Sequence, residues 1–521
     1  MQHTGRPAPD TPGPHKPGAA SAGHRPPPRH PAADPPPPPR TGPGVSSWRH
    51  RRLCRTLHGR GDRLGTDLRS ARRLGLGRLL RQRPNRPRCR GPRLSAAVQS
   101  RAWRQLPPLQ SDRQSRPLPS AHAGRARRTS ARSLGRWPAR ATGHRKRIMM
   151  HHLLGIATAT PPLTIAQHDS AELAASVLPA SPSHHRSLAA LYRTTRIRTR
   201  GSVLLEPPQG EGYRQSFFQP ATSADDAGPT TRDRLARYEA AAPVLAEAVA
   251  ARALEQAAVP AAEVSHLITC SCTGFSNPGV DLALMQRLGL STHISRTHVG
   301  FMGCHGGFNA LRVASALAAA DPAAVVLTTA VELCSLHFQY SDRGDQLVAN
   351  AIFADGAAAV VGTSQPQPAT DGGSRWLLRH QASAVLPESE DCMAWTIGDN
   401  GFVMQLSPRV PQVIASHLGP FVDATLARLG LQRRDIRSWA VHPGGPRVLT
   451  CVEEALGLPD ASLEVSRSVL ADHGNMSSAT IFFILERLRR QAAPLPCVAL
   501  AFGPGLTCEL AVFTEAGQPA D

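Results

Sequence analysis

Cys304 has the local context that best suits nucleophilic chemistry in this 521-residue chain. It follows a strand-like run that ends in Phe301-Met302-Gly303, and it precedes an Ala/Leu-rich segment, HGGFNALRVASALAAA, that predicts a helix. Free amide groups and the dipole at a helix N-terminus favour negative charge, so we expect the thiol to ionise more easily there. A free cysteine is as often a small buried apolar residue, and the local sequence leaves both interpretations open.

His442 and Asn475 stand at two further strand-to-helix junctions. His442 ends the strand-like SWAVH before the turn PGGP, and Asn475 lies in DHGNMSSAT at the start of a predicted helix. Alone, the histidine suits a structural hydrogen-bonding role and the asparagine an N-cap. In a parallel α/β sheet such junctions gather at one edge, where ligands bind. Together with Cys304 they predict acyl transfer, in which imidazole and amide donors stabilise an oxyanion or enolate.

Strand-like and helical patterns alternate through the body of the chain and predict an α/β fold. Residues 232–257 are rich in Ala, Leu, Glu and Arg and predict a helix that is interrupted, or entered late, at Pro243. A composition shift at SQPQPATDGGSR suggests a connection between two halves, 149–370 with the cysteine and 371–521 with the histidine and asparagine. The similar order of elements in the two halves indicates a pseudo-duplicated architecture.

The net charge of +22 comes from one end of the chain. Residues 1–148 hold 34 basic and 5 acidic residues, whereas the remainder holds 26 and 33. The first segment has 23 prolines, no glutamate and no lasting apolar periodicity, so we expect it to be disordered. It could be a tail that binds nucleic acid, a targeting peptide, or upstream sequence translated from too early a start. The junction RKRIMMHHLLGIATATPP favours the last, with the working protein starting near Met149.

Several motifs follow one another in a recognisable order: GFMGCHGGFNALRVA, AIFADGAAA, VHPGGPRVL, GNMSSATIFFILE and AFGPGLTCE. In this order they resemble the bacterial type III polyketide synthases of the chalcone and stilbene synthase superfamily, from about Leu153 to Phe513. The resemblance implies a thiolase-like fold of two pseudo-duplicated αβαβα halves and a homodimer.

The resemblance also implies a reaction. Cys304 would accept an acyl group from a coenzyme A thioester, and His442 would stabilise the thiolate as an ion pair. His442 and Asn475 would then hold the carbonyl of malonyl-CoA as it loses carbon dioxide, and the enolate would extend the acyl chain. Repeated rounds would end in a pyrone, a resorcinol or a phloroglucinol-type product. Acyl-CoA and malonyl-CoA are substrates, and no cofactor or metal is implied.

Further positions match the substrate cavity of that family. Phe353 matches an aromatic gatekeeper, although it could be an ordinary core residue, and Met404 replaces the second gatekeeper, usually phenylalanine. Asn277 falls where the partner subunit's cavity is approached. The other cavity positions are Cys272, Thr273, His337, Gly503, Pro504 and Gly505.

Arginines are the candidates for the coenzyme A phosphates, because the body of the chain has no lysine. The basic run LYRTTRIRTRG supplies Arg193, Arg196, Arg198 and Arg200. A solvated charged edge is an equally good interpretation of this run.

Other classes of protein fit less well. The initiating β-ketoacyl carrier-protein synthases share the Cys-His-Asn set but typically carry HQAN-like and NTSAAS motifs, whereas this chain has HPGGP and GNMSSA. A nucleic-acid-binding role would depend on residues 1–148 alone. Eight of the ten cysteines lie in the body at irregular spacings, and there is no secretory pattern or apolar run long enough to span a membrane. We therefore expect a cytoplasmic enzyme with free thiols.

Overall fold

The computed structural model describes residues 151–178, 182–207, 213–366 and 375–516. All of them lie in the second of two units of the chain, Arg132–Asp521. The basic segment 1–148, the start expected at Met149 and most of the connection between the halves lie outside the described residues.

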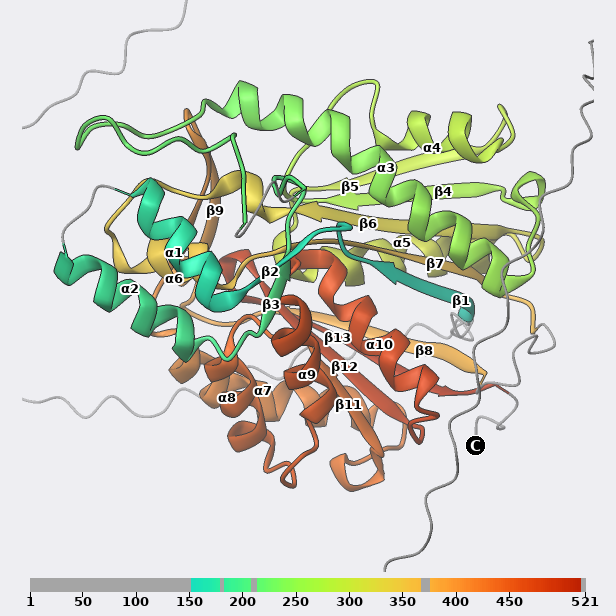
Figure 1. The fold of residues 1–521 in the computed structure, drawn as a ribbon. Helices are drawn as coiled ribbons and strands as arrows, with labels where there is room; N and C mark the ends of the chain where they lie inside the picture. Colours follow the sequence, from blue (N-terminus) through green and yellow to red (C-terminus); the bar gives the residue numbers. More distant parts are fainter. Residues whose placement is uncertain (1–150, 179–181, 208–212, 367–374, 517–521) are drawn as a thin grey trace, which may run out of the picture. The chain divides into compact units, whose positions relative to one another are not determined.

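A nine-stranded mixed sheet is the frame of the fold, in the order β11-β12-β13-β8-β1-β7-β6-β4-β5 (Figure 1). Its strands are β1 (His151–Ala159), β4 (His266–Ser271), β5 (Ser295–Gly300), β6 (Val325–Leu333), β7 (Asp355–Thr363), β8 (Trp376–Val385), β11 (Ser438–Val441), β12 (Cys497–Gly503) and β13 (Thr507–Glu515). β1 pairs with β7 along most of its length but meets β8 only through His151 and His152. The sheet therefore divides at the β1–β8 junction into two groups of strands.

The two groups repeat one topology. In the first half, β1 to β7, strand β4 runs parallel to β6, β6 antiparallel to β7, and β7 antiparallel to β1. In the second half, β8 to β13, strand β11 runs parallel to β12, β12 antiparallel to β13, and β13 antiparallel to β8. The repeated order of elements agrees with the pseudo-duplication expected from the sequence.

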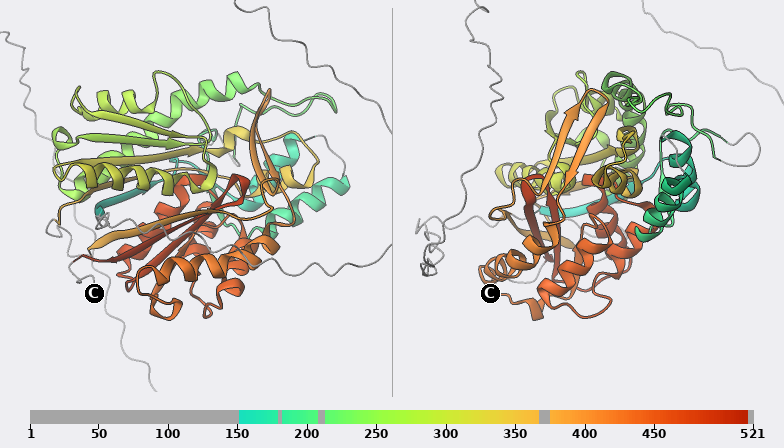
Figure 2. Two further views of the ribbon diagram at one scale, coloured as in Figure 1. Left: turned by 180° about the vertical axis from the view of Figure 1, so that it is seen from behind. Right: turned by 90° about the vertical axis from the view of Figure 1, so that its left-hand side faces the viewer.

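Helices lie between and outside the two groups of strands (Figures 1 and 2). They are α3 (Thr231–Ala257), α4 (Val280–Leu288), α5 (Gly306–Ala320), α7 (Val410–Ala427), α8 (Pro446–Leu456), α9 (Glu464–His473) and α10 (Thr480–Arg490). Buried side chains of α5 and α10 share one apolar cluster with strands of both groups. A second cluster joins α3 to the first group, and a third joins α7 and α8 to the second, which gives α, β, α, β and α layers.

Alternation along each strand divides the apolar residues between these layers. In β12, Cys497 and Ala499 face the cluster of α5 and α10, whereas Val498 and Leu500 face α7 and α8. Both faces of the strand are therefore buried, as expected for a sheet covered by helices on both sides.

Helix α3 begins one residue earlier than predicted and runs unbroken through Pro243. A capping box between Thr230 and Asp233 starts it, and its Ala- and Leu-rich face packs on β1, β6 and β7. The interruption expected at Pro243 is wrong, because this packing holds the helix together on both sides of the proline.

Shorter elements beside the main layers were not predicted. They are β2 (Thr164–Ala166), α1 (Gln167–Val177), α2 (Pro182–Thr194), β3 (Thr199–Gly201), α6 (Gly344–Ile352), β9 (Met393–Gly398) and β10 (Gly401–Leu406), with 3-10 turns η1 (Ala261–Glu263), η2 (Gly303–His305), η3 (Cys334–His337), η4 (Arg433–Asp435), η5 (Ser477–Ala479) and η6 (Pro504–Leu506). In the described part of the chain, no helix is long and apolar enough to cross a membrane.

Candidate active site

Cys304 lies in the turn that joins β5 to α5. Strand β5 ends at Gly300, Phe301 and Gly303 both have positive φ angles, and η2 then leads into the helix. Gly303 is required here, because a Cβ at this position would lie 2.5 Å from Cδ of Pro504. The tight turn buries Cys304, whose side chain stands next to the start of α5.

His442 directly follows β11, and its backbone continues the sheet pairing. Its N–H donates to the carbonyl oxygen of Leu500 over 2.8 Å. The residue is 1% exposed, and neither ring nitrogen has a hydrogen-bond partner among the described residues. A buried imidazole with both nitrogens unengaged is available to exchange a proton with a ligand.

Asn475 is held by backbone bonds on both sides of Phe353. Its N–H donates to the carbonyl of Ile352 over 2.8 Å, and its carbonyl accepts from Ala354 N–H over 2.9 Å. Its Oδ1 atom accepts from the N–H of Ser477 over 2.8 Å. Because the oxygen is engaged by the chain, the amide group of Asn475 remains as the donor.

The three residues line one cavity. A space of about 510 Å³ is bounded by Cys304, His442 and Asn475, together with Phe353 and Met404. The hydroxyl of Ser477 lies 3.7 Å from the Cys304 sulfur and donates to it. The Cys, His and Asn side chains come from three junctions that are far apart in the sequence, and they meet here as the sheet-edge argument predicted.

Burial controls the protonation of this cavity. It raises the pKa of Cys304 to about 11, although hydrogen bonds from Ser477 and Asn475 act in the opposite direction. Burial and the neighbouring His305 lower the pKa of His442 to about 3. Burial therefore opposes the easier ionisation of Cys304 that the helix N-terminus predicts, and it agrees with the alternative of a buried cysteine.

Phe353 and Met404 line two further cavities as well. One, of about 310 Å³, also contacts Cys272, Thr273, Cys304 and Pro504. The other, of about 860 Å³ and partly open to solvent, contacts His337 and residues of α1, α2 and α6. The two residues assigned as gatekeepers thus separate three spaces, two of which touch the Cys304 side chain.

A buried carboxyl group, Glu332, organises the smallest cavity and was missed in the sequence. Its oxygens accept hydrogen bonds from the N–H of Cys272, from the Thr273 hydroxyl at 2.6 Å, and from the Ser478 hydroxyl. Burial raises the pKa of Glu332 despite these donors. A glutamate inside the apolar strand VVLTTAVEL was the signal that could have identified it.

His337 is fixed by the backbone and by aromatic rings. Its Nε2 atom donates to the Thr273 carbonyl over 2.6 Å, because Nδ1 accepts from the N–H of Phe402 at 3.0 Å. Its ring stacks on that of Phe402 with centroids 4.1 Å apart, and the Trp395 indole donates to the Cys272 carbonyl. Burial lowers the pKa of His337 to about 3, so this residue shapes the wall as a neutral group.

The glycine loop at the end of β12 packs against the cysteine turn. A Cβ added at Gly503 would overlap Cδ2 of His305. The ring of Pro504 likewise occupies the space that a Cβ at Gly303 would need. Gly505 has a φ of 69° inside η6. These three loop residues lie beside the site, whereas Asn277 is exposed on the surface of this single chain.

The four candidate arginines differ in their surroundings. Arg193 and Arg196 are exposed. Arg200 is buried, and its guanidinium donates to the carbonyls of Asn350 and Phe353 and to the Ser170 hydroxyl. The Arg200 guanidinium is therefore occupied by hydrogen bonds to oxygen atoms of the protein.

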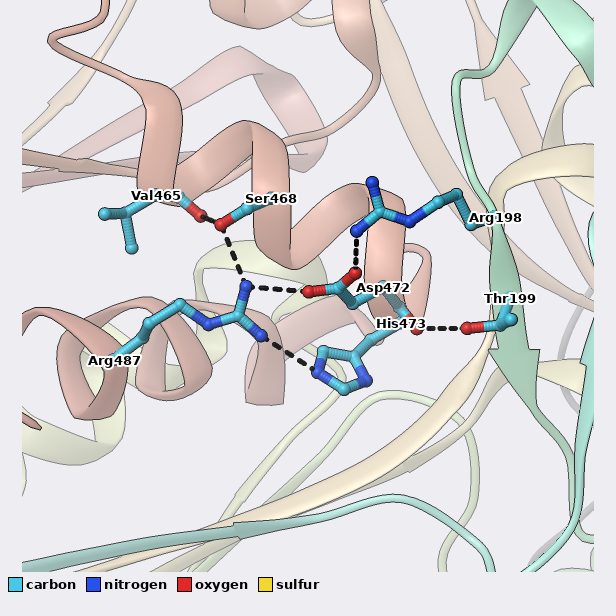
Figure 3. A network of polar contacts seen from close by, with 7 residues as sticks. All are labelled: Arg198, Thr199, Val465, Ser468, Asp472, His473 and Arg487. Atoms are coloured by element: carbon cyan, nitrogen blue, oxygen red, sulfur yellow. Dashed lines mark hydrogen bonds and ion pairs between the residues drawn. The ribbon is translucent and has the colours of Figure 1, made fainter. Parts of the chain in front are cut away.

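Arg198 forms part of a charged cluster at the end of α9 (Figure 3). The Asp472 carboxylate lies between Arg198 and Arg487, and its backbone carbonyl accepts from the Thr199 hydroxyl over 2.6 Å. Arg487 also donates to His473 Nε2 at 3.3 Å. The cluster fastens the last turn of α9, which leads directly into Gly474 and Asn475.

No group of three or more His, Cys, Asp or Glu side chains that could hold a metal ion occurs within the described ranges. The cysteines of these ranges are all free thiols.

Comparison with known proteins gives a consistent result. The profile of the N-terminal domain of chalcone and stilbene synthases matches residues 141–366, and that of their C-terminal domain matches residues 378–516. The Mycobacterium tuberculosis protein named alpha-pyrone synthesis polyketide synthase-like Pks18 is 36% identical over 364 residues, which is 69% of this chain and 90% of that protein. The 1,3,6,8-tetrahydroxynaphthalene synthase of Streptomyces peucetius is 33% identical, over 69% of this chain and 91% of that enzyme.

Solved structures of the same type share the fold. The polyketide synthase PKS-I of the brown alga Ectocarpus siliculosus matches with a TM-score of 0.65 and 28% identity, over 70% of this chain and 98% of that one. The C-terminal type III polyketide synthase domain of Steely1 from Dictyostelium matches with a TM-score of 0.63 and 27% identity, over 70% and 99%. The α/β, thiolase-like fold expected from the sequence motifs is confirmed.

Proposed function

The chain belongs to the chalcone and stilbene synthase family and is a type III polyketide synthase, and we propose that it loads acyl groups onto Cys304 and extends them with malonyl-CoA. The observation that carries this assignment of residues is the single cavity bounded by Cys304, His442 and Asn475. The first half of the fold supplies the nucleophile, and the second supplies the imidazole and the amide. This distribution supports a division of the chain into 149–370 and 371–521, which we propose as its two halves.

Loading begins from a neutral pair. Burial keeps the Cys304 thiol and the His442 imidazole uncharged, so His442 acts as the general base when Cys304 attacks the thioester carbonyl. The sulfur forms a bond to the acyl carbon and its proton moves to the imidazole. The coenzyme A thiolate then leaves and takes that proton, which returns His442 to its neutral form.

Extension takes place in the same cavity, but the negative charge now develops on an enolate oxygen. When malonyl-CoA loses carbon dioxide, the electron pair of the broken bond forms an enolate whose oxygen accepts from Asn475 Nδ2 and from a ring N–H of His442. Because this charge builds up only in the transition state, fixed donors lower the barrier, by about 3 kcal/mol each. The enolate carbon attacks the acyl group and displaces the Cys304 thiolate, and one proton is taken up in each round.

The exposed arginines are the proposed contacts for the coenzyme A phosphates. Ile197 packs with Ile352, a residue of the cavity wall, so Arg196 and Arg198 flank that wall on the solvent side. Arg193 lies one turn away on α2. We leave Arg200 out of this set because its guanidinium is buried and donates to protein oxygens, whereas Arg198 pairs with Asp472 but its side chain is exposed.

The remaining features of the proposed enzyme follow from its family. It works as a homodimer in the cytoplasm, needs its coenzyme A substrates but no resident cofactor, and releases a pyrone, a resorcinol or a phloroglucinol-type product. Pks18 is named for alpha-pyrone synthesis and supports the first of these products.

Two reactions measured on the same variants test this assignment. His442→Ala and Asn475→Ala should lower malonyl-CoA decarboxylation about 100-fold or more, since each removes a donor to the enolate oxygen. Cys304→Ala should block acyl loading, followed by mass spectrometry of the intact protein, while decarboxylation stays detectable. Cys451→Ala, which changes a thiol outside the three cavities, serves as the control. Normal product formation by the Cys304→Ala protein would refute the proposal.

The same assay distinguishes this enzyme from a carrier-protein synthase. It contains malonyl-CoA and no acyl carrier protein, so a type III polyketide synthase should give pyrone or resorcinol products. Strict dependence on an added carrier protein would favour an initiating β-ketoacyl synthase.

A further inference from the structure

A buried arginine bonded to the wall of the catalytic cavity has no part in the mechanism above. Arg200 lies in β3 and is 8% exposed, and its guanidinium stands over the ring of Tyr192. Its hydrogen bonds to Asn350, Phe353 and Ser170 all end on uncharged oxygens. A buried cation is costly in free energy unless such bonds replace its water. The contacts of Arg200 therefore indicate what the residue holds in place.

The guanidinium stands at the C-terminal end of α6, where the last carbonyl groups of a helix need partners from elsewhere and a positive charge is favourable. Nη1 of Arg200 donates to the carbonyls of Asn350 over 2.8 Å and of Phe353 over 2.7 Å. The carbonyl of Ile352, just before Phe353, accepts from the N–H of Asn475 over 2.8 Å. Arg200 and Asn475 therefore bond to neighbouring carbonyls of the same helix end.

The stem of the same arginine packs against the residue before Asn475. Gly474 has a φ of 73°, and a Cβ on it would lie 3.2 Å from Cγ of Arg200 and 3.1 Å from the carbonyl oxygen of Ile352. The N–H of Ala354 donates to the carbonyl of Asn475 over 2.9 Å. Arg200 thus contacts both of the chain segments that the backbone of Asn475 joins.

The segment that carries Arg200 is itself fastened to α9. The N–H of Arg198 donates to the carbonyl of Ala471 over 2.7 Å. The hydroxyl of Thr199 donates to the carbonyl of Asp472 over 2.6 Å (Figure 3). Neighbouring residues of one short segment therefore bond to the end of α9 and to the end of α6.

We propose that Arg200 is a positioning residue for malonyl-CoA decarboxylation, which holds Asn475 against the segment around Phe353 so that the Asn475 amide meets the enolate oxygen. The inference rests on the proposed function and adds a residue to it. Arg200 acts through the backbone of Phe353 and through its stem contact with Gly474. Its loss removes a donor from two carbonyls and frees the chain on both sides of Asn475, and small displacements of an oriented group are costly to catalysis.

Two reactions separate this role from a general effect on stability. Loading from acyl-CoA depends on Cys304 and His442, whereas decarboxylation depends on His442 and Asn475. Arg200→Met keeps an unbranched side chain but no donor, and we expect its kcat for malonyl-CoA decarboxylation to fall about tenfold. The loading rate, followed by mass spectrometry of the intact protein, should stay within about twofold of the wild type. Both rates are expressed per folded protein, measured by circular dichroism.

The KM for malonyl-CoA separates positioning from substrate binding. Arg200 also borders the 860 Å³ cavity, and a direct contact with substrate there would raise the KM when the side chain is replaced. Positioning of Asn475 predicts instead that kcat falls while the KM stays within about twofold. Arg200→Lys keeps the charge but not the planar fork of donors, so its kcat should fall by a smaller factor, about threefold.

Arg234 provides a matched control, because it is also a buried arginine that donates to backbone carbonyls, those of Leu336 and Phe338 at η3. Arg234→Met should destabilise the protein and leave the ratio of the two rates as in the wild type.

Three results would overturn the role of Arg200: an unchanged decarboxylation kcat in Arg200→Met, an equal fall in both reactions, or a rise in the KM alone. Should Arg200→Met fail to fold, Arg200→Lys carries the test by the same criteria. Absence of decarboxylation in the wild type, or full decarboxylation by Asn475→Ala, would instead overturn the proposed function.

Discussion

In the first half of the molecule the turn before the central helix α5 carries Cys304, whereas in the second half the turn before α10 carries serines and follows Asn475. The two turns meet. A Cβ on Gly307, at the start of α5, would lie 2.7 Å from the carbonyl oxygen of Ser478. The absence of a side chain at Gly307 therefore allows the second turn to approach the first. One topology used twice therefore brings a nucleophile and a hydrogen-bond donor together, with their chemistry determined by a few residues at equivalent places.

The two halves differ more in the additional helices and strands that lie outside the duplicated layers. The first half carries α1, α2, β2, β3 and α6, which gather beside the layers in Figure 1. These elements line part of the 860 Å³ cavity together with η3 and the segment 202–218, and the β9–β10 hairpin of the second half contributes Trp395, Phe402 and Met404. The duplicated layers hold the proposed catalytic residues, whereas the elements without a counterpart in the other half line the proposed space for substrate.

Acid should destabilise both halves. Burial lowers the pKa of His151 to about 4 and that of His337 to about 3 in the first half, and it lowers the pKa of His442 to about 3 and that of His473 to about 4 in the second. As the pH falls from 6.5 to 4, the unfolded chain binds protons that the folded chain does not, so each residue removes up to about 1.4 kcal/mol of stability per pH unit.

Urea unfolding of His151→Phe measures one such contribution. Both ring nitrogens of His151 lack partners among the described residues, and the variant should lose about 2 kcal/mol less stability than the wild type between pH 6.5 and 4.5. The exposed His168 provides the control, since His168→Phe should behave as the wild type does. Parallel stability curves for wild type and His151→Phe would contradict the assignment.

Removal of Glu332 should weaken the contact between the halves, because its partner Ser478 lies in the second half. Glu332→Ala leaves the Cys272 N–H and the Thr273 and Ser478 hydroxyls without their acceptor, at a cost of about 3 kcal/mol in the free energy of unfolding. Thermal unfolding checks this. Glu247→Ala, which removes an exposed partner of Arg287, should change stability far less, and equal losses in the two variants would argue against a special role for Glu332.

The charged cluster of the second half should have a smaller effect. Asp472→Asn weakens the link to Arg198 and Arg487 that holds the end of α9, so we expect a loss of about 1 kcal/mol in stability and a lower kcat. Asp423→Asn disrupts a comparable pair with Arg433 away from Asn475. An equal loss of kcat in both variants would show that the Asp472 cluster does not position Asn475.

The smallest effect is expected at the solvent edge of the first half. Arg196→Glu should raise the KM for malonyl-CoA about threefold at low salt and leave kcat unchanged, because exposed ion pairs are weak and screened. Arg428→Glu reverses an exposed charge on the second half and serves as the control. A KM that does not move in Arg196→Glu would remove this residue from the phosphate contacts.

The sequence predicted those parts of the site that depend on local pattern. Strand, turn and helix signals are contiguous around Cys304, His442 and Asn475, so their junctions could be recognised without the fold. The sequence did not decide between a reactive and a buried Cys304, because the burial that raises its pKa comes from residues distant in the chain and is invisible in a short segment.

Contacts between distant segments account for the rest of what was missed. Glu332 bonds to Cys272, just after β4, and to Ser478 on η5. Arg200 lies in β3 and is buried, whereas Arg198 lies just before that strand and is exposed. Spacing alone grouped these two arginines together. Their separation depends on tertiary packing against α6 and α9.

The backbone bonds between Asn475 and the two neighbours of Phe353 tie together two residues of the proposed site. A shift of the main chain at Ile352 or Ala354 would also move Asn475, the proposed oxyanion donor. We therefore expect Phe353, the proposed gatekeeper, to admit substrate by rotation of its ring about the side-chain bonds, with the main chain at rest. Admission of substrate would then leave the position of Asn475 unchanged.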